Sequence, residues 1–314
     1  MQSSKKLFDD LLQQITVYEA QEAKEIVFWL MEFYLGLKKI EILSDKLAEK
    51  QVNWTNIIER LNSHEPIQYI LGETDFYGRK FLVNDSVLIP RPETEELVQL
   101  VIENSQQSTV HGPQLKVSSR QSVVGEKALS TQNSKPHGGP FRTLLDIGTG
   151  SGCIAISLAK ELPNFQVFAY DISEKALETA QKNAELNNAN VIFEKVDILH
   201  SPLSIIHYPL SIIVSNPPYV TKKEIELMRK NVIDFEPHLA LFVENNDPLV
   251  FYKAIANFAY NNLTINGLVA VEINESLGKE TAEIFIKKGF SDVVIVKDIH
   301  QKERFVKARL SKKI

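Results

Sequence analysis

Cysteine is nearly absent from this sequence, because Cys153 is the only one among 314 residues. A lone cysteine excludes an intramolecular disulfide and argues against a metal site built from thiolates. The histidines are scattered along the chain, so we expect no bound metal ion. Basic residues are not in excess either. The formal net charge of −5 argues against a protein that coats nucleic acid duplexes.

Long apolar runs are also missing. Residues 1–10 are polar and carry two lysines and two aspartates, so we expect no signal peptide. The most apolar stretch near the start, residues 26–37, is too short to span a bilayer and contains Glu32. We therefore expect a cytoplasmic protein without membrane contacts. A monomer is the default expectation for its oligomeric state.

The first part of the chain has the pattern of a helical domain. Apolar residues recur at helical spacing through residues 1–72. Ser44 is placed to cap a helix over residues 45–51, and Asn53 is placed to cap a helix that begins at Trp54. We expect an N-terminal helical domain that ends near residue 72.

The pattern changes twice in the next segment. Aromatic and β-branched residues among turn residues predict a β-hairpin linker over 73–90, and a helix is expected over 93–103. Residues 104–140 then lack aromatic side chains, are rich in Ser and Gln, and have Glu126 as their only acid. Such a segment buries too little apolar surface to offset its ordering entropy. We expect it to be a disordered insertion.

The rest of the chain, within a domain expected over 91–314, alternates between strands and helices. The expected strands cover 143–147, 167–170, 191–195, 210–214 and 268–273, followed by a closing pair over 293–296 and 304–310. The expected helices cover 153–161, a segment capped by Ser173 that ends near 187, and a segment that ends near 288. This alternation predicts an α/β fold with a largely parallel, Rossmann-like sheet and helices on both faces.

A glycine-rich turn follows the first of these strands, in Asp146-Ile147-Gly148-Thr149-Gly150-Ser151-Gly152. Such a turn lets the backbone approach a ligand closely and exposes amides at a helix start. A nicotinamide dinucleotide would favour a third glycine where this chain has Cys153. S-adenosylmethionine has no pyrophosphate and needs only the turn and suitable acids, so we expect S-adenosylmethionine as the cofactor.

Acidic residues at the ends of strands complete this candidate cofactor site. Asp171 ends the second strand and is placed to accept the ribose hydroxyls. Asp197 ends the third strand and is placed to accept from the adenine amine, although a loop acid explains it equally well. Ile198 is placed to cover the ring. The expected cofactor residues are Asp146, Gly148, Thr149, Gly150, Ser151, Gly152, Asp171, Asp197, Ile198 and Asn216.

The motif Asn216-Pro217-Pro218-Tyr219 follows an apolar strand that ends with Ser215. Alone it is also compatible with a proline-stiffened turn. It resembles the active-site signature of methyltransferases that use S-adenosylmethionine to methylate planar nitrogens. In open α/β sheets ligands bind at the carboxyl ends of the strands, which is where this motif lies.

Longer stretches carry a more specific resemblance. They are Glu65-Pro66-Ile67-Gln68-Tyr69-Ile70-Leu71-Gly72, Ile89-Pro90-Arg91-Pro92-Glu93-Thr94-Glu95, Glu236-Pro237, and Lys297-Asp298-Ile299. With the glycine turn and Asn216–Tyr219, they resemble the release factor glutamine methyltransferases over nearly the whole chain except 104–140. Asn274 departs from the family pattern, which often has glycine there. The resemblance implies a class I methyltransferase domain and methylation of the glutamine in the Gly-Gly-Gln loop of peptide release factors.

The chemistry of that reaction assigns roles to the motif. An amide nitrogen is a poor nucleophile, so the main task is orientation rather than proton removal. Asn216 is placed to accept one substrate N–H and donate to the substrate carbonyl, and the Pro217 carbonyl to accept the other N–H. Pro218 and Tyr219 complete the expected substrate site, with Tyr219 packed over the flat amide. Arg91, Thr94 and Glu95 either brace the cofactor pocket or begin a helix with a salt bridge.

Two other functions fit parts of this pattern. One is an N6-adenine methyltransferase of nucleic acids, because the same tetrapeptide serves that chemistry. The acidic balance and the lack of a basic recognition domain weigh against stable nucleic acid binding. The other is a non-catalytic module that binds the cofactor and docks to a translation factor, and the intact Asn216 argues against it.

Overall fold

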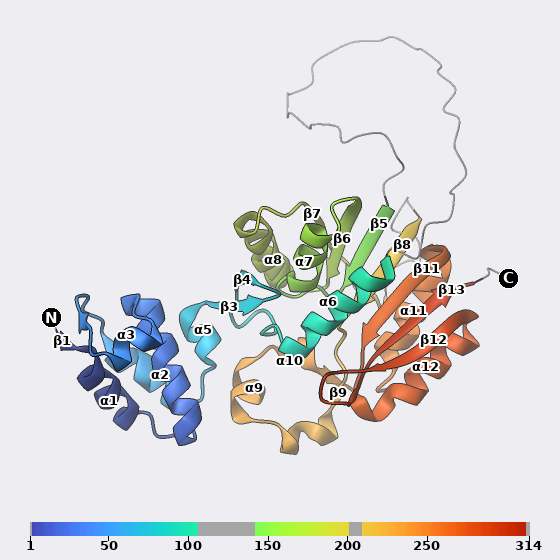
Figure 1. The fold of residues 1–314 in the computed structure, drawn as a ribbon. Helices are drawn as coiled ribbons and strands as arrows, with labels where there is room; N and C mark the ends of the chain where they lie inside the picture. The colour runs from blue at the N-terminus through green and yellow to red at the C-terminus, as the bar shows by residue number, and fades with distance from the viewer. Residues whose placement is uncertain (1, 106–141, 201–208, 312–314) are drawn as a thin grey trace, which may run out of the picture.

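The computed structural model describes residues 2–105, 142–200 and 209–311 (Figure 1). Helices of the first part of the chain gather at one side of the molecule. A large sheet with its helices forms the other side, and the hairpin of β3 (Glu73–Phe76) and β4 (Arg79–Leu82) lies between the two (Figure 1). Within the described residues, no helix combines the length and apolar character needed to cross a membrane.

The N-terminal part is a small helical bundle. Its elements are β1 (Gln2–Ser3), α1 (Ser4–Gln14), α2 (Ala20–Leu35), α3 (Lys39–Leu43), β2 (Leu47–Ala48), α4 (Trp54–Asn62) and α5 (Ile67–Leu71). The apolar faces of these helices form one buried cluster, in which Leu11, Leu30 and Leu61 have almost no exposed surface. The Asn53 cap is confirmed, because its side chain accepts a hydrogen bond from the Thr55 amide.

The expected helix over 45–51 is wrong. Helix α3 instead ends at Leu43 with Ser44 as its C-cap, and Asp45 has a left-handed backbone with φ of 59°. The Asp45 carboxylate accepts hydrogen bonds from the Ser3 hydroxyl at 2.6 Å and the Lys5 amide at 3.1 Å. Asp45 therefore caps the start of α1 rather than its own helix, and the chain beyond it pairs as β2 with β1.

The predicted hairpin is present as β3 (Glu73–Phe76) and β4 (Arg79–Leu82), which are antiparallel. Its strands end at Leu82, and residues 83–91 have no regular structure. Asn183 of α8 (Glu174–Leu186) accepts a hydrogen bond from the Leu82 amide at 2.6 Å and donates to the Leu82 carbonyl at 2.9 Å. These two bonds fix the hairpin against the sheet domain.

Helix α6 (Pro92–Ser105) is longer than expected. Asn104 and Ser105, which were assigned to the insertion, are buried residues of this helix. Asn104 Oδ1 accepts a hydrogen bond from Lys307 Nζ at 3.0 Å, and the Asn104 carbonyl accepts one from Arg309 Nη2 at 2.9 Å. Tertiary contacts therefore extend α6. The remainder of the expected insertion lies outside the described residues.

The central sheet has seven strands in the order β12-β13-β11-β8-β5-β6-β7. Their bounds are β5 (Arg142–Ile147), β6 (Phe165–Asp171), β7 (Val191–Lys195), β8 (Leu210–Ser215), β11 (Leu263–Glu272), β12 (Phe290–Lys297) and β13 (Glu303–Leu310). The run from β11 to β7 is parallel, and β13 is antiparallel to both of its neighbours. The alternation therefore predicted every strand of this sheet.

Helices cover both faces of the sheet. The other elements are α7 (Cys153–Glu161), α8 (Glu174–Leu186), β9 (Val220–Thr221), η2 (Lys222–Leu227), α9 (Lys230–Phe235), α10 (His238–Leu241), β10 (Phe242–Val243), α11 (Val250–Asn262), η3 (Glu275–Leu277) and α12 (Gly278–Lys287). Leu144 and Ile212 belong to the buried cluster that includes residues of α6 and α7, whereas Leu145 and Ile213 belong to the cluster with α11 and α12. Burial on both faces explains why these strands are apolar throughout.

The strand register aligns the carboxyl ends of β5, β6, β8 and β11. Ile147 at the end of β5 pairs with Ser215 of β8 and with Tyr170 of β6. Ser215 pairs in turn with Val271 of β11. The residues that follow these positions, the glycine turn, Asn216, Asp171 and Glu272, therefore share one edge of the sheet.

Candidate active site

A cavity of about 370 Å³ opens at this edge. The predicted site residues that line it are Gly148, Thr149, Gly150, Ser151, Asp171, Asp197, Ile198, Asn216, Pro217 and Pro218. Arg91 and Thr94, at the start of α6, line it as well. Asp146, Gly152 and Tyr219 do not line the cavity, so these three lie behind the residues that do.

Gly152 has a packing role. Its φ is +81°, and a Cβ atom there would lie 2.9 Å from Ile156 Cδ1 and 3.1 Å from Ala180 Cβ. A side chain would therefore clash with both α7 and α8. Gly152 therefore allows the start of α7 to pack closely against α8.

Asp171 joins the end of β6 to the glycine turn. Its Oδ2 atom accepts from the Gly150 amide and its Oδ1 atom accepts from the Ser173 amide, both at 2.8 Å. Burial raises the pKa of this carboxyl group, and the amides oppose that effect. Each carboxyl oxygen has a second lone pair, so Asp171 can also accept hydroxyl donors from a ligand in the cavity.

Asp146 lies beneath the turn and is fully buried. Its Oδ2 atom accepts from the Thr149 hydroxyl at 2.6 Å, whereas Oδ1 has no hydrogen-bond partner within the described residues. Burial raises the pKa of Asp146 to about 7, although the Thr149 hydroxyl opposes the rise. Asp146 thus fixes Thr149, which lines the cavity, and holds an unpaired buried acceptor beside the turn.

Asp197 has the local contacts of a loop acid and also lines the cavity. Oδ1 accepts from the Leu199 amide at 2.9 Å, and Oδ2 lies 2.7 Å from His200 Nδ1. The pKa of Asp197 is lowered, because these contacts outweigh the effect of burial. Ile198, next to it, adds an apolar side chain to the cavity wall.

The Asn216–Tyr219 motif follows β8 as expected. Asn216 is half-buried, and its Nδ2 atom donates to Thr94 Oγ1 at 3.3 Å. The Asn216 carbonyl would lie 4.0 Å from a Cβ atom on Gly148, which places the motif directly beside the glycine turn. A donor bound at the turn and an acceptor held by Asn216 would therefore meet in one cavity.

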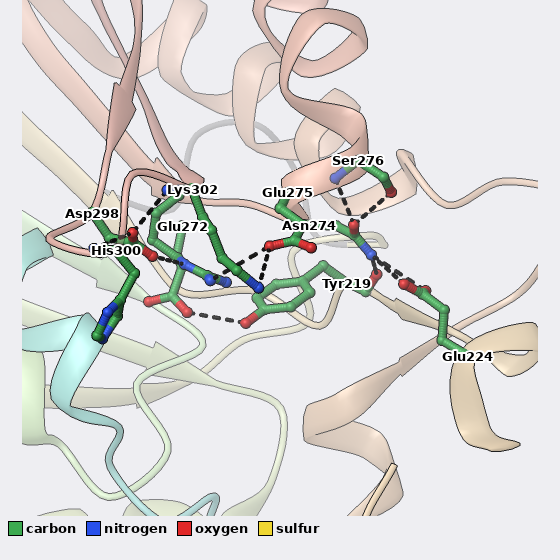
Figure 2. Close-up of polar contacts among 10 residues, drawn as sticks. Tyr219, Glu224, Glu272, Asn274, Glu275, Ser276, Asp298, His300 and Lys302 are labelled. Carbon is green, nitrogen blue, oxygen red and sulfur yellow. Dashed lines mark hydrogen bonds and ion pairs between the residues drawn. The ribbon is translucent and has the colours of Figure 1, made fainter. Parts of the chain in front are cut away.

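Tyr219 points to Glu272, the last residue of β11. The Tyr219 hydroxyl donates to Glu272 Oε1 at 3.1 Å (Figure 2). Burial, together with the nearby Glu272 carboxylate, holds the pKa of Tyr219 well above its usual range. Glu272 has no predicted role, although an acid at the end of the apolar run Val269-Ala270-Val271 is a usable signal.

Arg91 meets both interpretations of the linker motif, whereas Glu95 meets neither. Arg91 forms a salt bridge of 2.5 Å with the buried Glu236, and Glu236 also accepts from the Ile89 amide. Glu95 instead accepts from the Tyr77 amide at 2.7 Å and so secures the hairpin. Arg91 lines the cavity, whereas Glu95 does not.

Asn274, the departure from the family pattern, links the segment after β11 to the segment after β8. Its Nδ2 atom donates to the Tyr219 carbonyl at 3.3 Å and to Glu224 Oε1 at 3.0 Å (Figure 2). Its Oδ1 atom accepts from the Ser276 amide at 3.0 Å. A glycine at this position would make none of these side-chain contacts.

Comparisons with known proteins identify the family. The models named Methyltransferase small domain and PrmC N-terminal domain match residues 120–235 and 10–72. Release factor glutamine methyltransferases of Flavobacterium psychrophilum and Bacteroides thetaiotaomicron are 43% and 40% identical to the chain over 296 residues. These alignments cover 93% of this chain in both cases, and 93% and 94% of the two relatives. The chain belongs to the release factor glutamine methyltransferase family. The relative from Lactococcus lactis is 37% identical over 87% of this chain and 88% of its own.

A member of this family is an S-adenosylmethionine-dependent enzyme with a class I methyltransferase fold, as the sequence predicted. The cavity fits that cofactor. It combines the acceptors of Asp171 and Asp197 with apolar side chains such as Ile198. Asp146 lies behind the wall and supports the cavity through its hydrogen bond with Thr149.

The structure adds wall residues that the sequence analysis did not predict. Leu239 and Ala240 of α10 and Phe251 and Ile255 of α11 line the cavity. Neither helix was expected, since α10 is only one turn long and α11 follows a segment without a clear cap. These side chains make this part of the cavity wall mostly apolar.

Proposed function

We propose that the protein transfers the methyl group of S-adenosylmethionine to the side-chain amide nitrogen (N5) of the glutamine in the Gly-Gly-Gln motif of a peptide chain release factor. The observation that carries this proposal is the position of Asn216. Its amide lies at the cavity, beside a glycine turn that lies next to Asp171. The names of the relatives support the same substrate.

The chain's own residues would bind and orient the two reactants. Gly148–Ser151, Asp171, Asp197 and Ile198 would hold the cofactor, with Asp171 accepting the ribose hydroxyls. The cofactor supplies an electrophilic methyl group. Asn216 and the Pro217 carbonyl would bind the two N–H groups of the acceptor amide and favour pyramidal nitrogen in the transition state. Because proline fixes φ, the Pro217 carbonyl keeps its direction.

No side chain is needed as a strong base. The methylated amide nitrogen is acidic and loses its extra proton readily to water. The buried acids at this edge, Asp146 and Glu272, already accept hydrogen bonds from Thr149 and Thr94. We therefore assign them to positioning rather than to proton transfer.

The domain organisation forms part of the same proposal. Residues 1–72 would be a helical domain with its own apolar core, 73–90 a linker, and 91–314 the catalytic domain. The cavity is lined mostly by the last of these, and Ser86, Val87, Leu88 and Pro90 of the linker also line it. We propose that the enzyme acts as a monomer in the cytoplasm, with a release factor as its protein partner and without stable nucleic acid binding.

Labelled cofactor tests the function directly. The protein is incubated with S-adenosylmethionine labelled at its methyl group and a purified release factor, and the product is mapped by peptide mass spectrometry. The label should appear on the glutamine of Gly-Gly-Gln, and a release factor with that glutamine replaced by alanine should stay unlabelled. Labelling of DNA or RNA with an unlabelled glutamine would instead support the adenine methyltransferase.

A further inference from the structure

The carboxylate of Glu272 binds two hydroxyl groups at the floor of the site. Glu272 is only 2% exposed, although it ends the sheet strand next to Asn216. Its Oε2 atom accepts from the Thr94 hydroxyl at 2.8 Å, and its Oε1 atom accepts from the Tyr219 hydroxyl at 3.1 Å. Thr94 is itself only 2% exposed and belongs to a different element, α6.

The bond to Glu272 decides what Thr94 can offer to Asn216. A carboxylate only accepts hydrogen bonds, so the single hydroxyl proton of Thr94 is committed to Glu272. Thr94 Oγ1 can then only accept, and it accepts from Asn216 Nδ2 at 3.3 Å. With the amide reversed, two oxygen atoms would face each other without a proton between them. The amide therefore has one favoured orientation, in which Oδ1 faces away from Thr94.

A positive charge lies behind Glu272 and favours its carboxylate form. Burial raises the pKa of Glu272, but its two hydroxyl donors and the positive charge of Arg304 act in the opposite direction. Arg304 is held by a 3.0 Å contact between its Nε atom and Oδ2 of the buried Asp298. The interactions therefore run from Asp298 through Arg304 and Glu272 to Thr94.

From this geometry we propose that Glu272 is a positioning residue for methyl transfer. Acting through Thr94, it fixes the side-chain amide of Asn216 with its oxygen presented to the acceptor nitrogen. The inference rests on the proposed function, because it requires an acceptor N–H that binds Asn216 Oδ1. It assigns Thr94 and Glu272 to the acceptor side of the reaction and leaves cofactor binding to the glycine turn and Asp171.

The first test compares variants at Thr94. Thr94→Val keeps the shape of the side chain and removes both hydrogen bonds, whereas Thr94→Ser keeps the hydroxyl. We expect Thr94→Val to lower kcat for release factor methylation about tenfold, the effect of losing one orienting hydrogen bond. The Kd for S-adenosylmethionine, measured by calorimetry, should stay within about twofold, and Thr94→Ser should recover most of the rate.

Thr143 provides the matched control. It is a buried threonine at the start of β5, and its hydroxyl donates to the Pro209 carbonyl at 2.6 Å, away from the cavity. Thr143→Val should lower the melting temperature about as much as Thr94→Val, without the loss of kcat. An equal loss of kcat in both variants would show that Thr94 acts only through stability and would overturn the inference.

Glu272→Gln tests the carboxylate itself and remains informative if Thr94→Val does not fold. Its amide can donate to Thr94, which frees the threonine proton for Asn216 Oδ1 and permits the reversed amide. We expect a lower kcat, and no more than about a twofold further loss when Glu272→Gln is combined with Thr94→Val. If the two losses of kcat multiply fully in the double variant, Glu272 does not act through Thr94, and the inference is overturned. A wild-type kcat in Glu272→Gln would overturn it as well. If the wild-type enzyme does not methylate the release factor, the proposed function fails instead.

Discussion

Asp171 Oδ2 and the Gly150 amide nitrogen lie 2.8 Å apart, in a hydrogen bond that joins the end of β6 to the glycine turn. The same carboxylate lines the cavity. Asp171 therefore has two tasks: it shapes the turn, and it offers its remaining lone pairs to a ligand. A substitution there affects both, and the two effects can be separated by the choice of side chain.

Asp171→Ala should weaken binding of S-adenosylmethionine by about 1.5–3 kcal/mol, the usual loss for a hydrogen bond to a charged group. Asp171→Asn keeps one acceptor oxygen and should lose less. Isothermal calorimetry measures both affinities. Glu174→Ala serves as the control, because Glu174 is exposed and contacts Lys195 on the surface. Unchanged affinity in Asp171→Ala would remove Asp171 from the cofactor site.

Asp146 makes the stability of the cofactor-free protein depend on pH. Its pKa is raised from 3.8 to about 7 by burial, so the folded protein keeps a proton that the unfolded chain releases. Stability therefore falls as the pH rises between these two values, and the penalty is complete above the higher one. Relative to Asp146→Asn, the wild type should lose up to about 4 kcal/mol of unfolding free energy over this range.

Urea unfolding of both proteins at several pH values measures this difference. Asn has no titrating group, so its curve supplies the reference that includes all other carboxyl groups. Parallel curves for the two proteins from pH 4 to 7 would contradict a raised pKa at Asp146. The Thr149 hydroxyl can still donate to the Asn oxygen, which keeps the turn comparable in the two proteins.

The fold could be predicted from the sequence where the local pattern of apolar residues agrees with their burial in the structure. The strands are apolar on both faces because each face is covered by helices, so their positions follow from continuous apolar runs such as Leu210–Ser215. The helix expected after Ser44 failed because Asp45 caps α1, from a position 40 residues away from Lys5. A local pattern carries no information about such a tertiary contact.

The same limit applies to the site. The glycine turn, Asp171 and Asn216 each follow a strand, so the rule that ligands bind at carboxyl ends was enough to group them. The hydrogen bond between Thr94 and Glu272 joins positions 178 residues apart, and only the folded chain shows that it exists. Tyr219 was expected over the substrate amide, but its hydroxyl is engaged by Glu272 and its side chain does not line the cavity.

The segment after α6 gives a further prediction. Replacing residues 106–140 with a short Gly/Ser linker should preserve methyl transfer, because loops of this length without core-forming residues are seldom needed for packing. Asn104 must be kept, since it contacts Lys307 and Arg309. Transfer of label to a release factor measures the outcome. A folded variant that binds the cofactor but no longer methylates would assign the segment to substrate binding. Extending the replacement to Asn104 should lower the melting temperature.

Asn216 gives the sharpest prediction for the reaction. Asn216→Ala should leave cofactor affinity nearly unchanged, because the side chain contacts Thr94 and the acceptor side of the cavity. It should lower kcat by about 10²–10³, as does removal of one orienting polar group in other active sites. Single-turnover methylation of a release factor, with calorimetry for the cofactor, separates the two effects.

Asn216→Asp tests whether the side-chain amide must be oriented by Thr94, or whether any oxygen acceptor at this position is enough. The carboxylate can still accept an N–H from the substrate amide, but it cannot donate to Thr94, whose own proton is bound to Glu272. Two oxygen acceptors would then face each other across the 3.3 Å now spanned by a hydrogen bond, close to a second buried carboxylate. The side chain should therefore turn or become protonated, and the variant should be at least as slow as Asn216→Ala.

If both variants methylate the release factor at the wild-type rate, Asn216 does not orient the acceptor. If only Asn216→Asp is active, acceptance of an N–H is the essential task, and donation to Thr94 is dispensable.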